Sequence, residues 1–276
     1  MDVSTILLIA AKEFRELWRS RWFAVMAAAF AALALALSLL GTAAMGLAGV
    51  AGFGRTTAGL LSLVMLIVPL IGLIMGAMSL AAEREHGTLL TLLAQPVTVS
   101  EVLLGKWTGL LAALAVAVFG GFAVSGLAIG RAVGLAGLRD YLALAGLTVG
   151  LGLVHLTLGL WISASSRRST SALGLAVLLW MVIIFFGDLG IMGTAVVLKL
   201  RPAQLLWLSF GNPAQVFRLA VLQAIRGDLE SLGAAGSYAA SALGLWLLPI
   251  LLTALTVWVI VPLAGAWAQF RRRGAL

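Results

Sequence analysis

Long uncharged stretches alternate with short groups of charged and polar residues along most of this sequence. A helix needs about 20 mostly apolar residues to cross the hydrocarbon core of a bilayer. The stretches long enough for this are 22–54, 56–82, 107–130, 141–166, 169–187 and 231–270. The last could hold two spans only with a very tight turn, so we expect one span near 242–264. The pattern predicts an all-α polytopic membrane protein with six transmembrane helices.

Residues 1–21 show the helical period of a surface helix instead. One face of this helix would be apolar and the other charged; the apolar set is Val3, Ile6, Leu7, Ala10, Phe14, Leu17 and Trp18, and the charged set is Lys12, Arg15, Glu16 and Arg19. The apolar stretch is short and the basic residues follow it, which is not the order of a cleavable signal. We expect an amphipathic helix lying in the membrane interface. A soluble helix packed on another domain is the alternative, but no soluble domain is evident.

Residues 83–100, between the second and third spans, contain charged residues and helix-ending signals. Gly87 should break the second span after the charged group 83–86, and Thr88 should cap a new short helix that Pro96 ends. Ser100 should cap the third span, with Glu101 favouring its N-terminal dipole. We therefore expect a short helix held between two spans, the alternative being a plain connecting loop.

Residues 188–241 are too apolar for disorder and too interrupted for a span. Gly211, Asn212 and Pro213 form a turn signal. Asn212 suits the N-cap and Pro213 the first position of an amphipathic helix that ends at Gly227. The expected organisation is 1–21 interfacial helix, 22–82 first two spans, 83–100 short helix, 101–187 next three spans, 188–241 outer helical segment and 242–276 last span and basic tail.

Composition and charge agree with a membrane location. Of the 276 residues 62% are hydrophobic and 10% charged, where soluble domains carry about 25% charged residues. Mean hydropathy is +1.13. The net charge of +8 is better explained by the positive-inside rule than by nucleic-acid binding. Cytoplasmic termini would place most basic residues inside: Lys12, Arg15, Arg19, Arg21, Arg84, Lys106, Arg167, Arg168, Arg271, Arg272 and Arg273.

Candidate catalytic and metal-binding chemistry is sparse. No cysteine is present, and neither H-E-x-x-H nor G-x-S-x-G occurs. A phosphate loop ending at Lys106 would need glycine where Ser100 stands. His155 is either a ligand or proton relay in the membrane, or a neutral histidine bonded to a threonine or backbone carbonyl. The thioethers of Met65, Met75 and Met78 could line a soft-metal path or simply fill the core. We expect no metal or cofactor on this chain.

Glycines four residues apart allow helices to approach closely. Such spacings join Gly72 to Gly76, Gly105 to Gly109, Gly126 to Gly130 and Gly134, and Gly146 to Gly150. We expect them to support packing within the bundle more than dimerisation.

Residues 83–106 read E-x-E-x-G-T-L-x-x-L-L-A-Q-P-V-x-x-S-E-V-L-L-G-K, and this motif resembles the ABC-2 type transporter permeases. The likeness in architecture, an interfacial helix followed by six spans, extends over nearly the whole chain. The resemblance implies a homodimer in the bacterial inner membrane with both termini cytoplasmic. It implies a cytoplasmic ATPase dimer that binds ATP and Mg, contacted through Glu83, Glu85, His86, Gly87, Thr88, Leu89, Leu90, Leu92, Leu93, Gln95 and Pro96.

Residues 211–219 resemble the same segment of permeases that serve assembly of the copper centres of nitrous oxide reductase. This implies a periplasmic β-helical partner contacted by Asn212, Pro213, Phe217, Arg218 and Arg226. With no cysteine and one histidine in the spans, bare copper is a poor cargo, while a sulfur species or force without cargo fits as well. A permease exporting a lipid, glycan or drug is the alternative, and a secondary carrier or intramembrane enzyme remains open.

Overall fold

The computed structural model describes residues 2–48, 51–133, 138–187, 201–225 and 242–273. Within these ranges, six helices are long and apolar enough to cross a membrane, as predicted. They are α2 (Arg21–Ala48), α3 (Ala51–Glu85), α5 (Val99–Val133), α6 (Leu138–Ser165), α7 (Ser169–Met181) with its π-helical continuation η1 (Val182–Phe186), and α12 (Leu247–Arg273).

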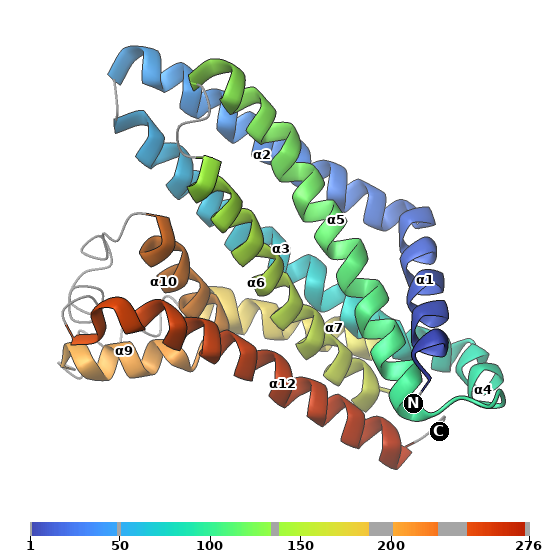
Figure 1. Ribbon diagram of the computed structural model, residues 1–276. Coiled ribbons are helices and arrows are strands. Elements are labelled where there is room, and N and C mark those ends of the chain that lie inside the picture. Colours follow the sequence, from blue (N-terminus) through green and yellow to red (C-terminus); the bar gives the residue numbers. More distant parts are fainter. Residues whose placement is uncertain (1, 49–50, 134–137, 188–200, 226–241, 274–276) are drawn as a thin grey trace.

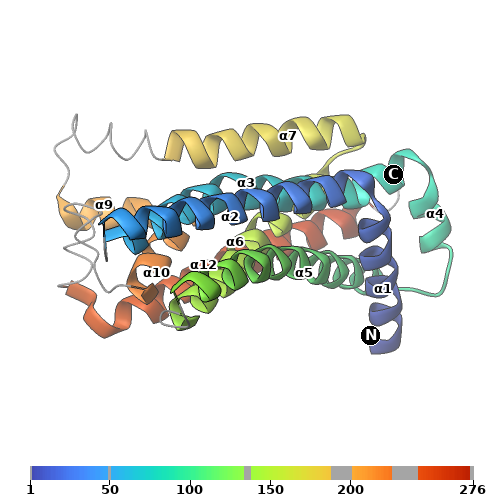
Figure 2. The same ribbon diagram turned by 90° about the horizontal axis from the view of Figure 1, so that it is seen from above.

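The spans form one elongated bundle with α3 and α6 at its centre (Figure 1). α2 and α5 pack on one side of this pair and α12 on another, while α7 lies against α3 (Figure 2). Both termini lie at one end of the bundle, together with α1 (Val3–Arg19) and α4 (Thr88–Leu93); we call this the α4 end. The helices α9 (Pro202–Phe210) and α10 (Pro213–Ile225) lie at the opposite end, the α9 end.

Glycines allow α3 and α6 to meet backbone to backbone. A Cβ atom added to Gly76 would lie 2.1 Å from the Leu156 carbonyl oxygen, and one added to Gly159 would lie 2.3 Å from the Leu73 carbonyl oxygen. Such contacts are possible only without side chains. The prediction for Gly72 and Gly76 is thus confirmed.

Other predicted glycine contacts differ in outcome. Gly105 and Gly109 of α5 receive α1, because added Cβ atoms would overlap Ile9 and Ala10 respectively. Gly146 and Gly150 face no neighbour within 4 Å, so the expectation of close packing there is wrong within this chain. They lie on a side of α6 that none of the described elements covers.

The amphipathic helix α1 crosses the ends of the spans (Figure 2). The Asp2 carboxylate caps it by accepting from the Ser4 hydroxyl at 2.7 Å and the Ser4 N–H at 3.0 Å, and these two hydrogen bonds lower the pKa of Asp2. Ile9 and Glu13 are the residues that α1 buries, whereas Leu7 and Trp18 of the predicted apolar face stay exposed. An exposed apolar face beside a bundle that crosses the bilayer is what an interfacial helix requires.

Charged residues mark helix ends less accurately than expected. Arg55 lies inside α3, which begins at Ala51, and Arg131 lies inside α5. The division between the uncharged stretches 22–54 and 56–82 therefore falls inside a helix. Arginine is a good helix former, so an isolated charge can mark a membrane boundary without ending the helix.

Candidate functional site

The short helix α4 follows a sharp turn at Gly87. This glycine has φ 76°, a left-handed conformation that costs other residues about 1–2 kcal/mol. Gly87 thus occupies the N-cap position, and Thr88 is the first helical residue. The predicted Thr88 cap is wrong by one position; its hydroxyl instead donates back to the Glu83 carbonyl at 3.3 Å.

The leucines of α4 divide between the bundle and the surface. Leu89 is fully buried in a cluster with Leu80 and Leu103, and Leu92 and Leu93 pack partly against that cluster. Leu90 is 61% exposed, and Gln95 and Pro96 beyond the helix are also exposed. The expectation that Leu89 offers contact area to a partner is therefore wrong, because its side chain anchors α4 to the bundle. Leu90 is the most exposed leucine of α4, and Leu92 and Leu93 remain partly accessible.

Three consecutive residues at the end of α3 each bind different helices. The Glu83 carboxylate accepts from Lys106 of α5 at 2.9 Å and Lys12 of α1 at 3.0 Å. The Arg84 guanidinium donates to the carbonyl of Ser163 in α6, at 3.2 Å, and to that of Ser166 just after it. Glu85 accepts from the backbone N–H and the hydroxyl of Ser169, the first residue of α7. The segment before Gly87 therefore joins α3 to α1, α5, α6 and α7.

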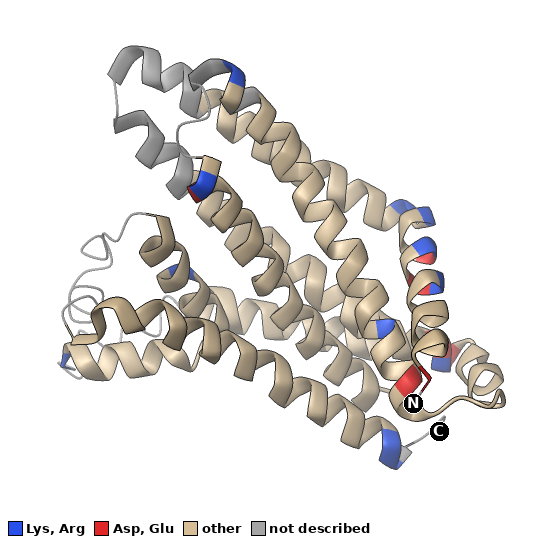
Figure 3. Cartoon of the chain, viewed as in Figure 1, with Lys and Arg blue, Asp and Glu red and all other residues tan. Residues whose placement is uncertain are grey.

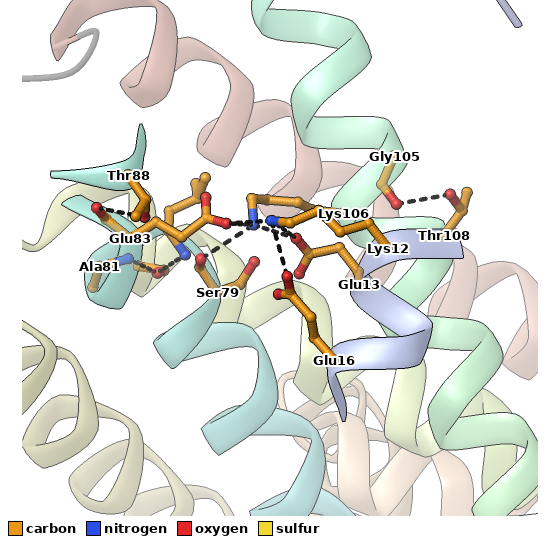
Figure 4. Close-up of polar contacts among 12 residues, drawn as sticks. Lys12, Glu13, Glu16, Ser79, Ala81, Glu83, Thr88, Gly105, Lys106 and Thr108 are labelled. Carbon is orange, nitrogen blue, oxygen red and sulfur yellow. Dashed lines mark hydrogen bonds and ion pairs between the residues drawn. The ribbon is translucent and has the colours of Figure 1, made fainter. Parts of the chain in front are cut away.

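Lys106 is the most buried member of this cluster, with 1% of its side chain exposed. Its ammonium group lies 2.6 Å from a Glu13 oxygen and donates to the Ser79 carbonyl at 3.4 Å (Figure 4). Sequence reasoning placed Lys106 among the inner basic residues, rejected it as a phosphate-loop lysine, and gave Glu13 no role. An ionisable residue so near the start of a span suggests a buried partner, and Glu13 supplies it.

Lys12 forms the exposed edge of the same cluster. It lies 3.5 Å from Glu13 and 3.4 Å from Glu16. Partial burial would by itself lower the pKa of Lys12, but the nearby carboxylates, Glu83 above all, outweigh this and hold the pKa above the usual lysine value. Lys12 therefore stays positively charged at neutral pH and balances carboxylates at the α4 end.

The third span begins with a reciprocal cap one turn after Pro96. Glu101 accepts from the Thr98 N–H at 2.8 Å, and Thr98 accepts from the Glu101 N–H at 3.3 Å. Thr98 therefore has the capping role that we expected of Ser100. The Ser100 hydroxyl accepts from the Trp267 indole at 3.0 Å, and Glu101 also accepts from the Asp2 N–H at 2.6 Å. These bonds fix α12 and the start of α1 to the start of α5.

Both histidines place Nδ1 beside a backbone carbonyl, and the candidate methionines differ in burial. His155 is fully buried and its Nδ1 lies 2.8 Å from the Leu151 carbonyl, as the backbone-bonded interpretation expected. Met65 and Met75 are buried, whereas Met78 is partly exposed. His86, at the turn before α4, is exposed and its Nδ1 lies 2.6 Å from the Ala82 carbonyl.

At the α9 end, Asn212 joins two elements. Its side-chain oxygen accepts from the Ala214 N–H at 2.9 Å, which confirms the predicted N-cap of α10. Its amide nitrogen donates to the Ile183 carbonyl in η1 at 2.7 Å.

Pro213 and Phe217 are buried, so they cannot form the partner surface expected of them. Arg218 is half-buried, and Arg226 lies outside the described residues. Exposed apolar residues at this end include Trp207 (71% exposed) and Leu208 of α9, whose role as a surface sequence reasoning missed.

Replacing Asn212 by alanine should destabilise the α9 end. The substitution removes both the cap and the bond to η1, and a lost N-cap alone costs about 1 kcal/mol. Asn212→Asp keeps the capping oxygen and loses only the amide donor, so we expect a smaller loss. Thermal unfolding of the purified chain in mild detergent measures both. Equal unfolding temperatures for Asn212→Ala and the unmodified chain would contradict the assignment.

Six spans, a helix across their ends and a short helix between the second and third spans define a multi-pass helical membrane protein with the architecture of a transporter permease. Residues 7–274 match the family model described as "ABC-2 family transporter protein", and the chain belongs to this family. It is similar to the "Probable ABC transporter permease protein NosY" of Stutzerimonas stutzeri, at 34% identity over 96% of this chain and 97% of the relative. The protein of the same name from Pseudomonas aeruginosa is also 34% identical, with the same coverage.

Proposed function

We propose that this permease transmits ATP-driven motion from a cytoplasmic ATPase dimer (NosF-like) to a periplasmic β-helical partner (NosD-like). Two copies of the chain would pair in the bacterial inner membrane, with the α4 end in the cytoplasm. The process served is maturation of the copper centres of nitrous oxide reductase. The relatives named NosY and the resemblance of residues 211–219 support this assignment.

The observation that carries the coupling role is the set of bonds made by residues 83–85. A force on α4 passes directly into the end of α3, because only His86 and Gly87 separate the two helices. Glu83 then pulls on α1 and α5, Arg84 pulls on α6, and Glu85 pulls on α7. Helices tied in this way move as rigid bodies. Among the described residues, Lys and Arg are more numerous at this end of the bundle, which favours the cytoplasmic side (Figure 3).

At the other end, α9 provides the contact surface. Trp207 and Leu208 are exposed there, while α10 packs on α6 and α12 beneath. Exposed aromatic side chains are favoured anchors of protein interfaces. The contact with the periplasmic partner is therefore assigned to α9, whereas the sequence-based expectation assigned it to α10.

Leu90→Glu tests the contact with the ATPase. Leu90 is exposed, so the charge should leave the permease folded but place an unpaired carboxylate in the apolar contact. We expect at least a tenfold loss of the co-purified ATPase from native membranes. The matched control is Leu245→Glu, since Leu245 is 94% exposed and lies next to the start of α12 at the α9 end. Undiminished recovery of the ATPase with Leu90→Glu would contradict the coupling role of α4.

A further inference from the structure

A groove of about 570 Å³ lies between α1 and α5 at the α4 end. Most of its lining is apolar: Leu7, Ala10, Ala11, Phe14 and Trp18 of α1, and Gly109 and Ala112 of α5. Leu7 and Trp18 are exposed, so the groove is open to its surroundings. Gly109 and Ala112 belong to the apolar span of α5. One wall of the groove is therefore part of a membrane-crossing helix, and the other is the interfacial helix.

An exposed apolar strip continues from the groove along α5. Its members recur at helical spacing: Ala112, Val116, Phe119, Ala123 and Leu127. Residues three or four positions apart share one face of a helix, and within the described part of the chain this face of α5 stays uncovered. Gly120 beside the strip also meets nothing within 4 Å of an added Cβ atom. An extended acyl chain that starts in the groove would run along this strip.

Arg15 and Arg19 are the charged residues that line the groove. They lie one helical turn apart, so they share one edge of α1. Both side chains are exposed, and neither forms an ion pair with a described residue. Arg21, which follows at the start of α2, is exposed as well. Guanidinium groups bind phosphate oxygens through paired N–H donors, so this edge is suited to a phosphate group.

Neighbouring carboxylates do not offset the charge of these arginines. The charged cluster on the other side of α1 holds acidic and basic residues in equal number: Glu13, Glu16 and Glu83 against Lys12, Lys106 and Arg84. Glu16 lies 3.4 Å from Lys12. The carboxylates of Asp2, Glu85 and Glu101 each accept from backbone N–H groups. The groove edge therefore carries a net positive charge, which favours an anionic occupant.

We propose that this groove binds an anionic phospholipid, such as phosphatidylglycerol. The phosphate accepts hydrogen bonds from Arg15 and Arg19, and one acyl chain fills the groove and continues along the strip of α5. The lipid belongs to the cytoplasmic leaflet in the orientation proposed above, and its binding requires no partner protein. Glu13 and Lys106 already join α1 to α5 by a buried ion pair. A lipid seated on both helices would therefore strengthen the same joint from its outer side.

Native mass spectrometry of the full-length permease, stripped of lipid in detergent and titrated with defined lipids, tests the proposal. Phosphatidylglycerol should bind about fivefold better than phosphatidylcholine with the same acyl chains, whose choline offsets the phosphate charge. Arg15→Gln combined with Arg19→Gln should bring the two lipids to nearly equal binding. The matched control, Arg271→Gln combined with Arg272→Gln, removes the same charge from exposed residues of α12 at the same end and should keep the preference.

A second pair of variants tests the acyl-chain part of the site. Ala112→Trp places a large side chain in the groove and should weaken phosphatidylglycerol binding several-fold. Leu175→Trp, at an exposed position of α7, should leave that binding unchanged. Ala112 is itself exposed, so the added ring should not disturb the bundle. Thermal unfolding in detergent without added lipid checks that each variant is folded.

Equal binding of the two lipids to the unmodified chain would overturn the proposal, as would an undiminished preference after both Arg15→Gln and Arg19→Gln. An equal loss in the α12 control would attribute the preference to overall charge and overturn it too. Unweakened binding to Ala112→Trp would do the same, since the groove would not hold the chain. A second copy covering the groove would also overturn the proposal. Ala112→Cys detects that case as a disulfide-linked dimer, because the chain has no cysteine of its own.

Discussion

Gly76→Ala is expected to prevent α3 and α6 from packing and to remove most folded protein from the membrane. The added methyl carbon would lie 2.1 Å from the Leu156 carbonyl oxygen and 2.6 Å from the Leu160 nitrogen. Both are backbone atoms of a central helix, so no side chain can rotate away and the helices must separate. Overpacking typically costs about 1–3 kcal/mol, and we expect Gly76→Ala at the upper end. Thermal unfolding in detergent and the amount of protein in the membrane are the measurements.

Other glycines of the same helix pair provide a graded series. Gly159→Ala should be as severe as Gly76→Ala, since its methyl carbon would meet the Leu73 backbone at 2.3 Å. Gly152→Ala should be milder, because its nearest contact is the movable end of the Leu114 side chain. Gly146→Ala should be neutral or slightly stabilising, as it faces open space and alanine favours helix. If Gly76→Ala and Gly146→Ala unfold at the same temperature, the backbone contact of α3 and α6 is contradicted.

The number of spans could be predicted from sequence because a bilayer imposes a minimum apolar length on each helix. The positions of the helix ends could not be predicted from sequence. A charged residue shows where an apolar stretch stops, but the backbone hydrogen bonds of the helix can continue past it. Arg55 shows this: it lies four residues after the start of α3. Likewise, glycine spacing identified Gly72 and Gly76 correctly and Gly146 and Gly150 incorrectly, because spacing defines a face without saying which helix covers it.

The short helix could be predicted for a related reason. Gly87 and Pro96 impose local backbone limits that no distant contact changes. The orientation of α4 depends instead on where α5 and α6 lie, so the burial of Leu89 and the exposure of Leu90 were not predictable from the motif. The charged cluster was missed because Glu13 and Lys106 are 93 residues apart. In the sequence, Glu13 and Lys106 appear only as isolated charged residues next to apolar stretches.

Lys106→Met should be the most damaging change at the α4 end. Methionine fills similar space, but it leaves the buried carboxylates of Glu13 and Glu83 without their closest cation. Removing one partner of a buried ion pair typically costs about 3–5 kcal/mol. Lys12 still contacts both carboxylates, so we expect a loss near 3 kcal/mol. Thermal unfolding in detergent measures the loss, and Lys12→Met, which removes a half-exposed lysine from the same cluster, should lose less.

Pairing Lys106→Met with Glu13→Gln separates lost attraction from unbalanced charge. The double variant removes one charge of each sign, so it should recover part of the stability that Lys106→Met loses. If the double variant loses as much stability as the two single variants together, the two side chains act independently and the ion pair is contradicted.

The same three variants also separate an effect on stability from an effect on coupling to the ATPase. Lys106 and Glu83 link α5 to the end of α3, so a double variant with restored stability should still stimulate the ATPase poorly, because the end of α3 has lost its ion pair with α5.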